Sequence, residues 1–247
     1  MKKNLTSSIA IFAVIIFTGC SNKEQSSTEK KEVKEEVKAR NDVMTKELQM
    51  ASTPDKIIAV LKEGNSRFVK GDLTFTDYPK QIMSASQGQY PAAVVLSCLD
   101  SRVPVEKVFD LGIGDIFVAR VAGNIINSDM LASMEFACKV SGSKLVLVLG
   151  HTECGAIKSA IDDVKLGNIT ELLAKIQPAI DSLSTFAGDR TSKNKEYVNK
   201  VTDKNVLVAM NNVRKNSPIL KEMEDKGEID IIGGNYDIST GKVTFIE

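Results

Sequence analysis

The stretch AAVVLSC, residues 92–98, is a short run of aliphatic and β-branched residues without polar alternation. Runs of this kind are typical of parallel strands that are covered on both faces. Two further runs share this character, DIFVARVA at 115–122 and KLVLVLG at 144–150, and segments of helical periodicity separate or follow them. This alternation predicts an α/β fold with a central, mostly parallel β-sheet flanked by helices.

The residues around these strands extend the same fold in both directions. Thr53-Pro54-Asp55 has the N-cap, the first-turn proline and the acidic residue of a helix start, and a glycine at position 71 ends that helix. The tail IDIIGGNYDISTGKVTFIE, residues 229–247, predicts two strands joined by a tight turn, and therefore a C-terminal antiparallel hairpin at the edge of the sheet. No internal repeat or linker interrupts residues 51–247, which are expected to form one domain.

The chain begins with MKKNLTSSIAIFAVIIFTGC, which has the layout of a secretory signal. Two lysines precede an apolar run from Ile9 to Phe17 that is too short for an ordinary membrane span. Gly19-Cys20 then resembles a bacterial lipoprotein cleavage box, which predicts a signal peptide over residues 1–19 and a lipidated Cys20. We therefore expect an exported protein, lipid-anchored in a bacterial cell envelope on its periplasmic or surface side. An uncleaved anchor and a plain signal peptide are the alternatives.

Lysine and glutamate dominate the segment after this signal, residues 20–50, which contains no aromatic residue. Such a segment cannot bury enough apolar surface to fold alone, so it is predicted to be a charged, flexible tether behind the lipidated cysteine. The formal net charge of the whole chain is +0, and no basic cluster stands out. The composition therefore argues against nucleic acid as a partner, and it restricts membrane attachment to the lipid anchor.

Beyond Cys20, three cysteines remain, Cys98, Cys138 and Cys154, and an odd number is a poor basis for disulfides in an exported protein. Cys98 ends the first predicted strand, whereas His151 and Cys154 follow the third one in GHTECG. Because the carboxyl ends of neighbouring parallel strands meet at one edge, these three side chains can converge. Two thiolates and an imidazole suit Zn²⁺, and three protein ligands leave the open position of a catalytic zinc site. Cys138 lies in a predicted helix and is expected to be an inert core thiol.

Asp100 and Arg102 follow Cys98 in the stretch SCLDSR. Two residues beyond Cys98 in an extended chain, Asp100 faces the same side, so its carboxylate can approach the metal or accept a hydrogen bond from water on it. Arg102 can hold that carboxylate through a forked pair. Zinc lowers the pKa of bound water from 15.7 toward about 7, and the pair would then orient a zinc-bound hydroxide toward a small electrophile. A purely structural ion pair is the alternative.

Three motifs resemble those of the β-class carbonic anhydrases, in the same order: CLDSR at 98–102, GDIFVARVAGN at 114–124 and LVLGHTECGAI at 147–157. The resemblance covers roughly residues 54–245. It implies zinc-dependent, reversible hydration of carbon dioxide to bicarbonate and a proton, with one Zn²⁺ per subunit. Position by position, it implies that the zinc ligands are Cys98, His151 and Cys154 and that the catalytic pair is Asp100 and Arg102. It also implies that the substrate pocket includes Gln89, Phe117 and Gly155.

Two positions depart from the pattern of this family. Ala122 stands in RVAGN where many members have valine, and Phe136 stands where many have tyrosine. Both residues keep the predicted substrate pocket apolar, as carbon dioxide requires. The resemblance also implies a homodimer or homotetramer, and it allows a closed state in which Asp100 occupies the fourth zinc position.

Two other functions stay open for the same residues. A hydrolase of carbonyl sulfide or carbon disulfide would use the same scaffold, and a long narrow tunnel to the metal would favour it. A non-catalytic zinc-binding lipoprotein would store or sense metal, but it would need neither Asp100 nor Arg102. For a carbonic anhydrase, the single histidine of the sequence, His151, leaves no second imidazole to export protons, so turnover should depend on buffer.

Overall fold

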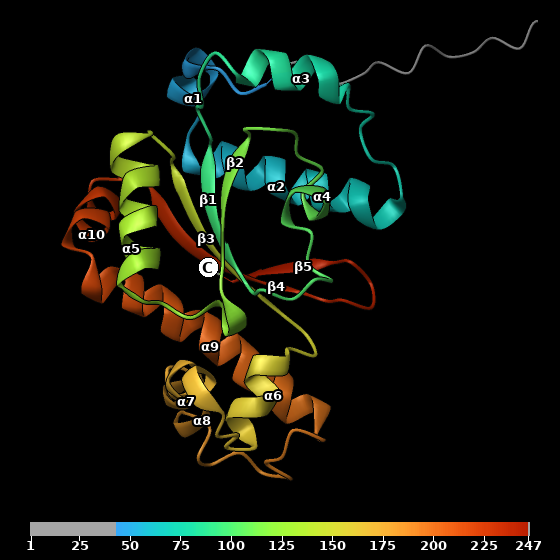
Figure 1. Ribbon diagram of the computed structural model, residues 1–247, viewed down its shortest axis with the longest axis vertical. Coiled ribbons are helices and arrows are strands. Elements are labelled where there is room, and N and C mark those ends of the chain that lie inside the picture. Colours follow the sequence, from blue (N-terminus) through green and yellow to red (C-terminus); the bar gives the residue numbers. More distant parts are fainter. Residues whose placement is uncertain (1–42, 247) are drawn as a thin grey trace, which may run out of the picture. The chain divides into compact units, whose positions relative to one another are not determined.

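The computed structural model describes residues 43–246 (Figure 1). The predicted signal peptide, the lipidation site Cys20 and most of the predicted tether lie outside the described residues. None of the described helices combines the length and the apolar character that crossing a membrane needs. In chain order the elements are α1 (Lys46–Ala51), α2 (Pro54–Lys70), α3 (Tyr78–Ala85), β1 (Ala93–Ser97), α4 (Val105–Val108), β2 (Ile116–Arg120), the 3₁₀ turn η1 (Ala122–Asn124), α5 (Ser128–Glu135), the π-helical η2 (Phe136–Val140), β3 (Leu145–His151), α6 (Gly155–Ile161), α7 (Gly167–Ala174), α8 (Gln177–Asp181), α9 (Lys195–Asn216), α10 (Pro218–Asp225), β4 (Asp230–Tyr236) and β5 (Val243–Ile246).

The strands form one sheet in the order β2-β1-β3-β4-β5. β1 pairs in parallel with β2 and β3, β3 pairs in parallel with β4, and β4 pairs antiparallel with β5. The predicted α/β fold, with a mostly parallel sheet and an antiparallel C-terminal edge, is confirmed. Every residue of β1 and β3 is buried, as expected for central strands that lack polar alternation.

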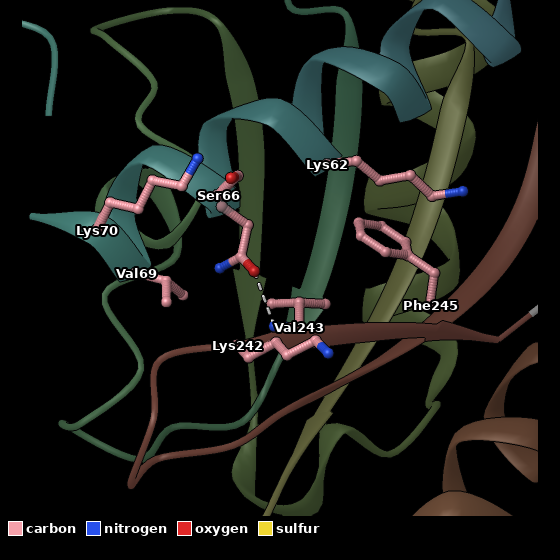
Figure 2. A pocket seen from close by; sticks show the side chains of 8 residues that line it. Lys62, Ser66, Val69, Lys70, Lys242, Val243 and Phe245 are labelled. Carbon is pink, nitrogen blue, oxygen red and sulfur yellow. Dashed lines mark hydrogen bonds between the residues drawn. The ribbon is translucent and has the colours of Figure 1, made fainter. Parts of the chain in front are cut away.

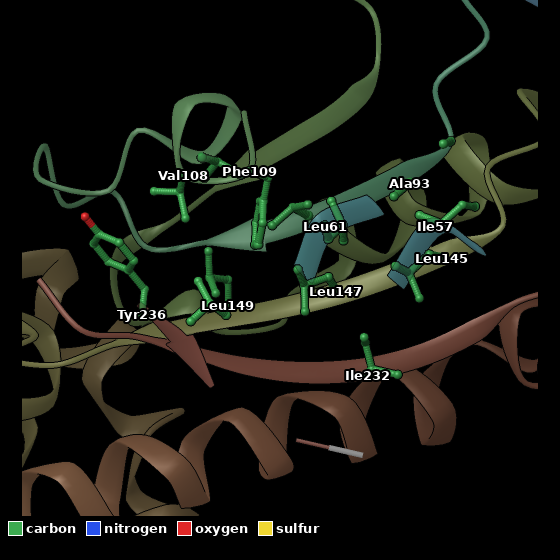
Figure 3. Packing of buried hydrophobic residues seen from close by; sticks show 14 of the residues in the cluster. Ile57, Leu61, Ala93, Val108, Phe109, Leu145, Leu147, Leu149, Ile232 and Tyr236 are labelled. Carbon is green, nitrogen blue, oxygen red and sulfur yellow. The ribbon is translucent and has the colours of Figure 1, made fainter. Parts of the chain in front are cut away.

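Helices cover both faces of the sheet, so its side chains pack into two apolar layers (Figure 1). In one layer, Leu147 of β3 belongs to the same buried cluster as Ile57 of α2 and Phe109, which follows α4 (Figure 3). In the other layer, Leu96 and Val148 pack with side chains from α5, α9 and α10. Burial of each such side chain contributes about 1.5–3 kcal/mol. These layers hold the strand ends, and the residues that follow them, in fixed positions.

The helix predicted after Thr53 has the expected ends. The hydroxyl of Thr53 accepts a hydrogen bond from the N–H of Lys56, and Gly71 ends α2 in the left-handed conformation with φ of 72°. Within the helix, Gly64 permits a close approach to the chain after α4, because a Cβ at this position would lie 1.9 Å from the carbonyl oxygen of Phe109. α2 therefore lies tightly against the layer that supports β1 and β3.

The first described helix, α1, starts at Lys46, inside the segment 20–50 that the sequence predicts to be a tether. Thr45 caps α1, and the buried side chain of Gln49 donates hydrogen bonds to the carbonyl oxygens of Pro91 and Ser141, each at 2.8 Å. The polar side chain of Gln49 holds this short helix against the rest of the chain, and the helix buries no apolar face. Hydrophobic periodicity therefore does not reveal it.

Candidate metal centre

Three side chains that can bind a metal converge at the carboxyl ends of β1 and β3. Cys98 follows the last residue of β1, His151 is the last residue of β3, and Cys154 directly precedes α6. The three residues are 4%, 0% and 1% exposed, and one ligand atom from each lies within 4.8 Å of the other two. The convergence that the sequence predicts is therefore confirmed, and the group could hold a metal ion.

The imidazole of His151 is held in the orientation of a metal ligand. Its Nδ1 lies 2.8 Å from the carbonyl oxygen of Thr152, to which it can donate its proton, and this leaves the lone pair of Nε2 free. Nε2 is buried and receives no hydrogen bond from the described residues. A buried acceptor without a partner costs about 1–3 kcal/mol. A cation beside Nε2 would supply the missing partner.

The two sulfurs fit a shared zinc ion. Sγ of Cys98 and Sγ of Cys154 lie 3.9 Å apart, and a tetrahedral zinc with Zn–S bonds of ~2.3 Å separates two sulfurs by about 3.8 Å. The hydrogen bond from Cys154 lowers the pKa of Cys98 to about 4, against the effect of burial, and the N–H of Gly123 adds a further bond to the same sulfur at 3.3 Å. The bond to Cys98 and burial together raise the pKa of Cys154. One thiolate thus forms readily, and the residues present fit a soft divalent cation.

Asp100 and Arg102 form the forked ion pair that the sequence predicts. Nε and Nη2 of Arg102 donate to Oδ1 and Oδ2 of Asp100 at 2.9 and 2.7 Å, and the backbone N–H of Arg102 donates to Oδ1 at 2.9 Å. The side-chain hydrogen bonds from Arg102 lower the pKa of Asp100 to about 2, although burial opposes them. Oδ2 of Asp100 lies 3.9 Å from Nε2 of His151. An ionised carboxylate therefore borders the three candidate ligands.

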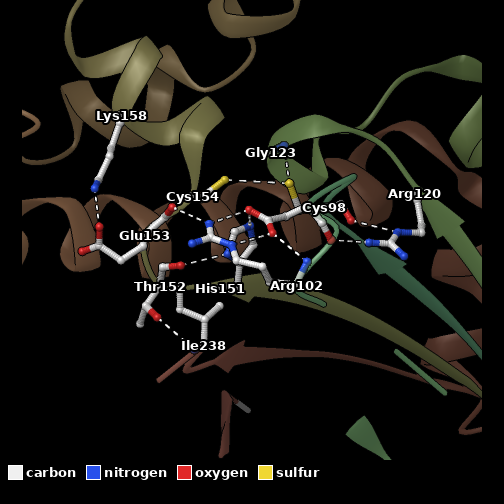
Figure 4. Close-up of polar contacts among 11 residues, drawn as sticks. Cys98, Arg102, Arg120, Gly123, His151, Thr152, Glu153, Cys154, Lys158 and Ile238 are labelled. Carbon is white, nitrogen blue, oxygen red and sulfur yellow. Dashed lines mark hydrogen bonds and ion pairs between the residues drawn. The ribbon is translucent and has the colours of Figure 1, made fainter. Parts of the chain in front are cut away.

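Glu153, between the two ligands of GHTECG, ties the loops of the site together. It adopts the left-handed conformation with φ of 58°, and its carbonyl oxygen accepts a hydrogen bond from Nη2 of Arg102 at 3.2 Å. Its carboxylate pairs with Lys158 of α6, as Figure 4 shows. Arg102 thus bridges the loop after β1 and the loop after β3. Sequence reasoning missed this contact, because a backbone carbonyl leaves no signal in the residue types.

Two of the predicted pocket residues adjoin the metal group. Ala122 opens η1 and directly precedes Gly123, whose N–H contacts the sulfur of Cys98. Gly155 opens α6 directly after Cys154, and among the described residues no heavy atom outside its chain neighbours and its own helix backbone lies within 4 Å of the place where a Cβ would stand. The space in front of Gly155 is therefore open, which agrees with a position beside a small substrate.

The other three predicted pocket residues lie elsewhere in the same chain. Phe117 is in register with Val94, which is four residues and so about 13 Å before Cys98 along the strand. Phe136 is 48% exposed, and its ring centroid lies 6.4 Å from that of Phe117. Gln89 is exposed and precedes β1, at the opposite end of the strand from Cys98. One chain alone does not bring these three residues to the metal group.

Two hollows in the described part of the chain are separate from the metal group. One of about 480 Å³ lies at β2 and α5, where Phe117 and Phe136 are among its mostly apolar lining residues. The other, of about 470 Å³, lies between α2 and β5 (Figure 2). Asn65 and Val243 both line it, and the side-chain oxygen of Asn65 accepts a hydrogen bond from the N–H of Val243 at 2.8 Å. Neither hollow includes a candidate metal ligand.

Comparison with known proteins agrees with the fold and the site. The family described as carbonic anhydrase matches residues 93–243. Carbonic anhydrase 2 of Mycobacterium tuberculosis is 35% identical over 191 residues, which cover 74% of this chain and 87% of that protein. A carbonic anhydrase of Mycolicibacterium smegmatis is 36% identical over 198 residues, which cover 78% and 93%. A tetrameric β-carbonic anhydrase of Sordaria macrospora has a similar structure, with a TM-score of 0.62 and 23% identity over 77% of this chain and 96% of that one.

The match spans strands β1 to β4 and includes all three candidate metal ligands. The chain therefore belongs to the carbonic anhydrase family, and its fold is that of the β-class of these enzymes.

Proposed function

We propose that this protein catalyses the reversible hydration of carbon dioxide to bicarbonate and a proton, with one Zn²⁺ held by Cys98, His151 and Cys154. The observation that carries this proposal is the convergence of two thiols and an imidazole nitrogen that has no hydrogen-bond partner among the described residues, directly beside the ion pair of Asp100 and Arg102. Membership of the carbonic anhydrase family supports the same reaction.

The chemistry follows from the donor set and from the ion pair. Zinc bound by two thiolates and one imidazole would lower the pKa of a coordinated water toward about 7. Because Arg102 holds the pKa of Asp100 at about 2, this carboxylate is ionised at neutral pH and can only accept a hydrogen bond. Asp100 would accept a hydrogen bond from the O–H of a water at the site, and this bond would turn the lone pair of the water oxygen toward carbon dioxide. Arg102 prevents rotation of the carboxylate because it holds both oxygens.

Stopped-flow measurement of carbon dioxide hydration, with zinc content determined on the same sample, tests this proposal. We expect stoichiometric zinc and rapid hydration at mildly alkaline pH. Stoichiometric zinc without hydration activity would contradict the proposal. Hydrolysis of carbonyl sulfide or carbon disulfide by that sample would then favour the hydrolase, and no turnover of any of these substrates would favour a zinc-storing lipoprotein.

We further propose a homodimer or homotetramer in which a second copy brings Gln89, Phe117 and Phe136 to the metal group. The support is geometric: these residues match pocket positions of the family, yet they lie away from Cys98 within one chain. In addition, β2 is an edge strand of the described sheet, and the large apolar side chain of Phe136 is 48% exposed. The similar protein of Sordaria macrospora is a tetramer.

We also propose that the mature protein is exported and attached to a bacterial cell envelope by lipid on Cys20. The support is the order of lysines, apolar run, Gly19 and Cys20 at the start of the sequence. Detergent phase separation of the protein made in a bacterium with lipoprotein processing tests this. The wild type should enter the detergent phase and a Cys20→Ala variant should not. A wild-type protein that stays in the aqueous phase would contradict the anchor.

A further inference from the structure

Arg120, the last residue of β2, reaches across to the turn that carries Cys98 and Asp100. Its Nε donates a hydrogen bond to the carbonyl oxygen of Cys98 at 3.1 Å, and its Nη2 donates to the carbonyl oxygen of Asp100 at 2.5 Å. Figure 4 shows the guanidinium of Arg120 beside Cys98. One planar side chain thus holds two backbone oxygens, two residues apart, in the loop that supplies a candidate ligand and the neighbouring carboxylate.

The position of Arg120 follows from the register of the sheet. Arg120 pairs with Ser97, the last residue of β1, and the N–H of Val121 donates to the carbonyl oxygen of Ser97 at 3.1 Å. Beyond Ser97 the chain turns away, so the carbonyl groups of Cys98 and Asp100 have no strand beside them. The guanidinium of Arg120 supplies the hydrogen-bond donors that a neighbouring strand would supply inside a sheet.

The contacts of Arg120 are directed at this turn. Within the described part of the chain, its guanidinium hydrogen-bonds to these two carbonyl oxygens and makes no ion pair. Arg120 is exposed, so its side chain does not fill the core. Filling of the core of this chain therefore does not account for it, whereas a role in fixing the turn does.

We propose that Arg120 is a positioning residue for the reaction, which fixes the backbone from which the Cys98 sulfur and the Asp100 carboxylate project. This inference rests on the proposed function. Arg102 sets the direction of the carboxylate, and Arg120 sets the place of the backbone that carries it. Because a guanidinium donates to two acceptors in a fixed fork and an ammonium does not, lysine should not replace Arg120.

Kinetics of Arg120→Ala and Arg120→Lys, measured on zinc-loaded protein, give the first test. We expect kcat to fall roughly 10- to 100-fold, as is typical when a group that orients a metal ligand is lost, and KM to change much less. Because Arg120 is exposed in the single chain, millimolar guanidinium added to the alanine variant should restore part of kcat. Arg120→Lys keeps the charge and most of the length, and it serves as the variant if the alanine protein does not fold.

A second readout does not depend on turnover. Cobalt(II) accepts the same tetrahedral sulfur and nitrogen ligands as zinc, and its visible absorption reports their arrangement. We expect the cobalt bands of both Arg120 variants to shift from those of the wild type, because the Cys98 sulfur and the Asp100 carboxylate are no longer held in place. Thermal unfolding of each variant shows how much of any change reflects stability.

Arg214 offers a matched control. Its Nη2 also donates to a backbone carbonyl oxygen, that of Ile231 at 2.7 Å, and its guanidinium pairs with Glu224, all on elements away from the metal group. Arg214→Ala should lower the melting temperature but leave kcat and the cobalt spectrum unchanged.

Two results would overturn the role of Arg120. One is an alanine variant with the kcat and the cobalt spectrum of the wild type. This result would overturn the role of Arg120 but not the proposed function, because the wild type would still hydrate carbon dioxide. The other is an equal loss of kcat in the Arg120 and Arg214 variants, which would make the contribution of Arg120 one of stability only. If the wild type itself did not hydrate carbon dioxide, the proposed function would fail, and the cobalt spectrum would decide on Arg120 alone: a shift supports it and no shift overturns it.

Discussion

Arg102 holds both oxygens of the Asp100 carboxylate, although its own side chain is 51% exposed. Replacement of Arg102 by alanine should leave Cys98, His151 and Cys154 in place, so we expect zinc to be retained. The freed carboxylate can rotate, and kcat should fall by about 10²-fold, the cost of a small misplacement of a reacting group. Stopped-flow hydration assays and zinc analysis on one sample check this. Full activity of the zinc-loaded variant would remove the ion pair from the mechanism.

At the scale of residues, the sequence predicted the groups that act through side chains and missed those that act through the backbone. Cys98, Asp100 and Arg102 are recognisable by their types and spacing. The N–H of Gly123 and the carbonyl oxygen of Glu153 are not, because every residue carries these groups and only the fold decides where they point. These backbone contacts hold a candidate ligand and the guanidinium beside it.

Among the elements, Asp110 fastens the loop after α2 to the end of α4. Its carboxylate accepts hydrogen bonds from Nε of Arg67 at 2.5 Å and from the N–H and hydroxyl of Thr74 at 3.0 and 2.7 Å. Burial raises the pKa of Asp110, but the bonds from Arg67 and Thr74 outweigh it, and the pKa is lowered. The folded state is therefore stabilised by the ionised form of this side chain.

An Asp110→Asn substitution tests this contact, since asparagine keeps the shape and tolerates the left-handed φ of 50°. A lowered pKa in the folded state means that the stabilisation is present above the unfolded value near ~3.9 and is lost as pH falls through the folded value. We expect the variant to be about 1.5–3 kcal/mol less stable at neutral pH, and the difference to shrink below about pH 4. Urea unfolding of both proteins at neutral pH and below about pH 4 checks this. A difference in the free energy of unfolding that does not change with pH would contradict it.

The strands were predictable to within one or two residues because continuous aliphatic runs, such as 144–150, have few alternatives to a covered parallel strand. The helix α1 was not, because Gln49 docks it through two hydrogen bonds rather than an apolar face. Local pattern thus predicts elements that apolar burial stabilises, and it misses elements that a single polar side chain holds.

For the whole molecule, the residues of the predicted pocket divide between two places. The sequence predicted that Cys98 and His151 meet, because parallel pairing of β1 with β3 brings their carboxyl ends together. It did not reveal that Phe117 of β2 and Phe136 of η2 lie together, away from that end. Their separation from Cys98 depends on strand register and on the place of α5, which no local pattern contains.

The proposed sharing of sites between copies makes a prediction about mixed assemblies. Cys98→Ser should lack a complete metal group, and Phe117→Ala should lack part of the pocket, so each alone should have little activity. When the two variants are unfolded together and refolded, a mixed dimer contains one site with both residues intact. We expect hydration activity to reappear in the mixture. A mixture that stays inactive would contradict this arrangement. So would a wild-type protein that is fully active while sedimentation equilibrium shows it to be a monomer.

Export of the proton is a further property of the whole chain. His151 is the only histidine in the sequence, its Nδ1 is bonded to Thr152, and its Nε2 is the proposed zinc ligand. No second imidazole can therefore carry the proton away, and kcat should rise with the concentration of a buffer whose pKa lies near the assay pH. Assays at constant ionic strength check this. Saturated turnover at the lowest buffer concentration would count against it.

Zinc K-edge X-ray absorption on the purified protein tests the central claim most directly. Coordination by Cys98, His151 and Cys154 predicts two sulfur neighbours at about 2.3 Å, one imidazole nitrogen at about 2.0–2.1 Å and a fourth, oxygen neighbour. A Cys154→Ser variant should lose one of the two sulfur neighbours, whereas a Cys138→Ser variant, which changes a buried thiol whose pKa burial raises to about 12, should keep both. A wild-type spectrum without two sulfur neighbours would contradict the account.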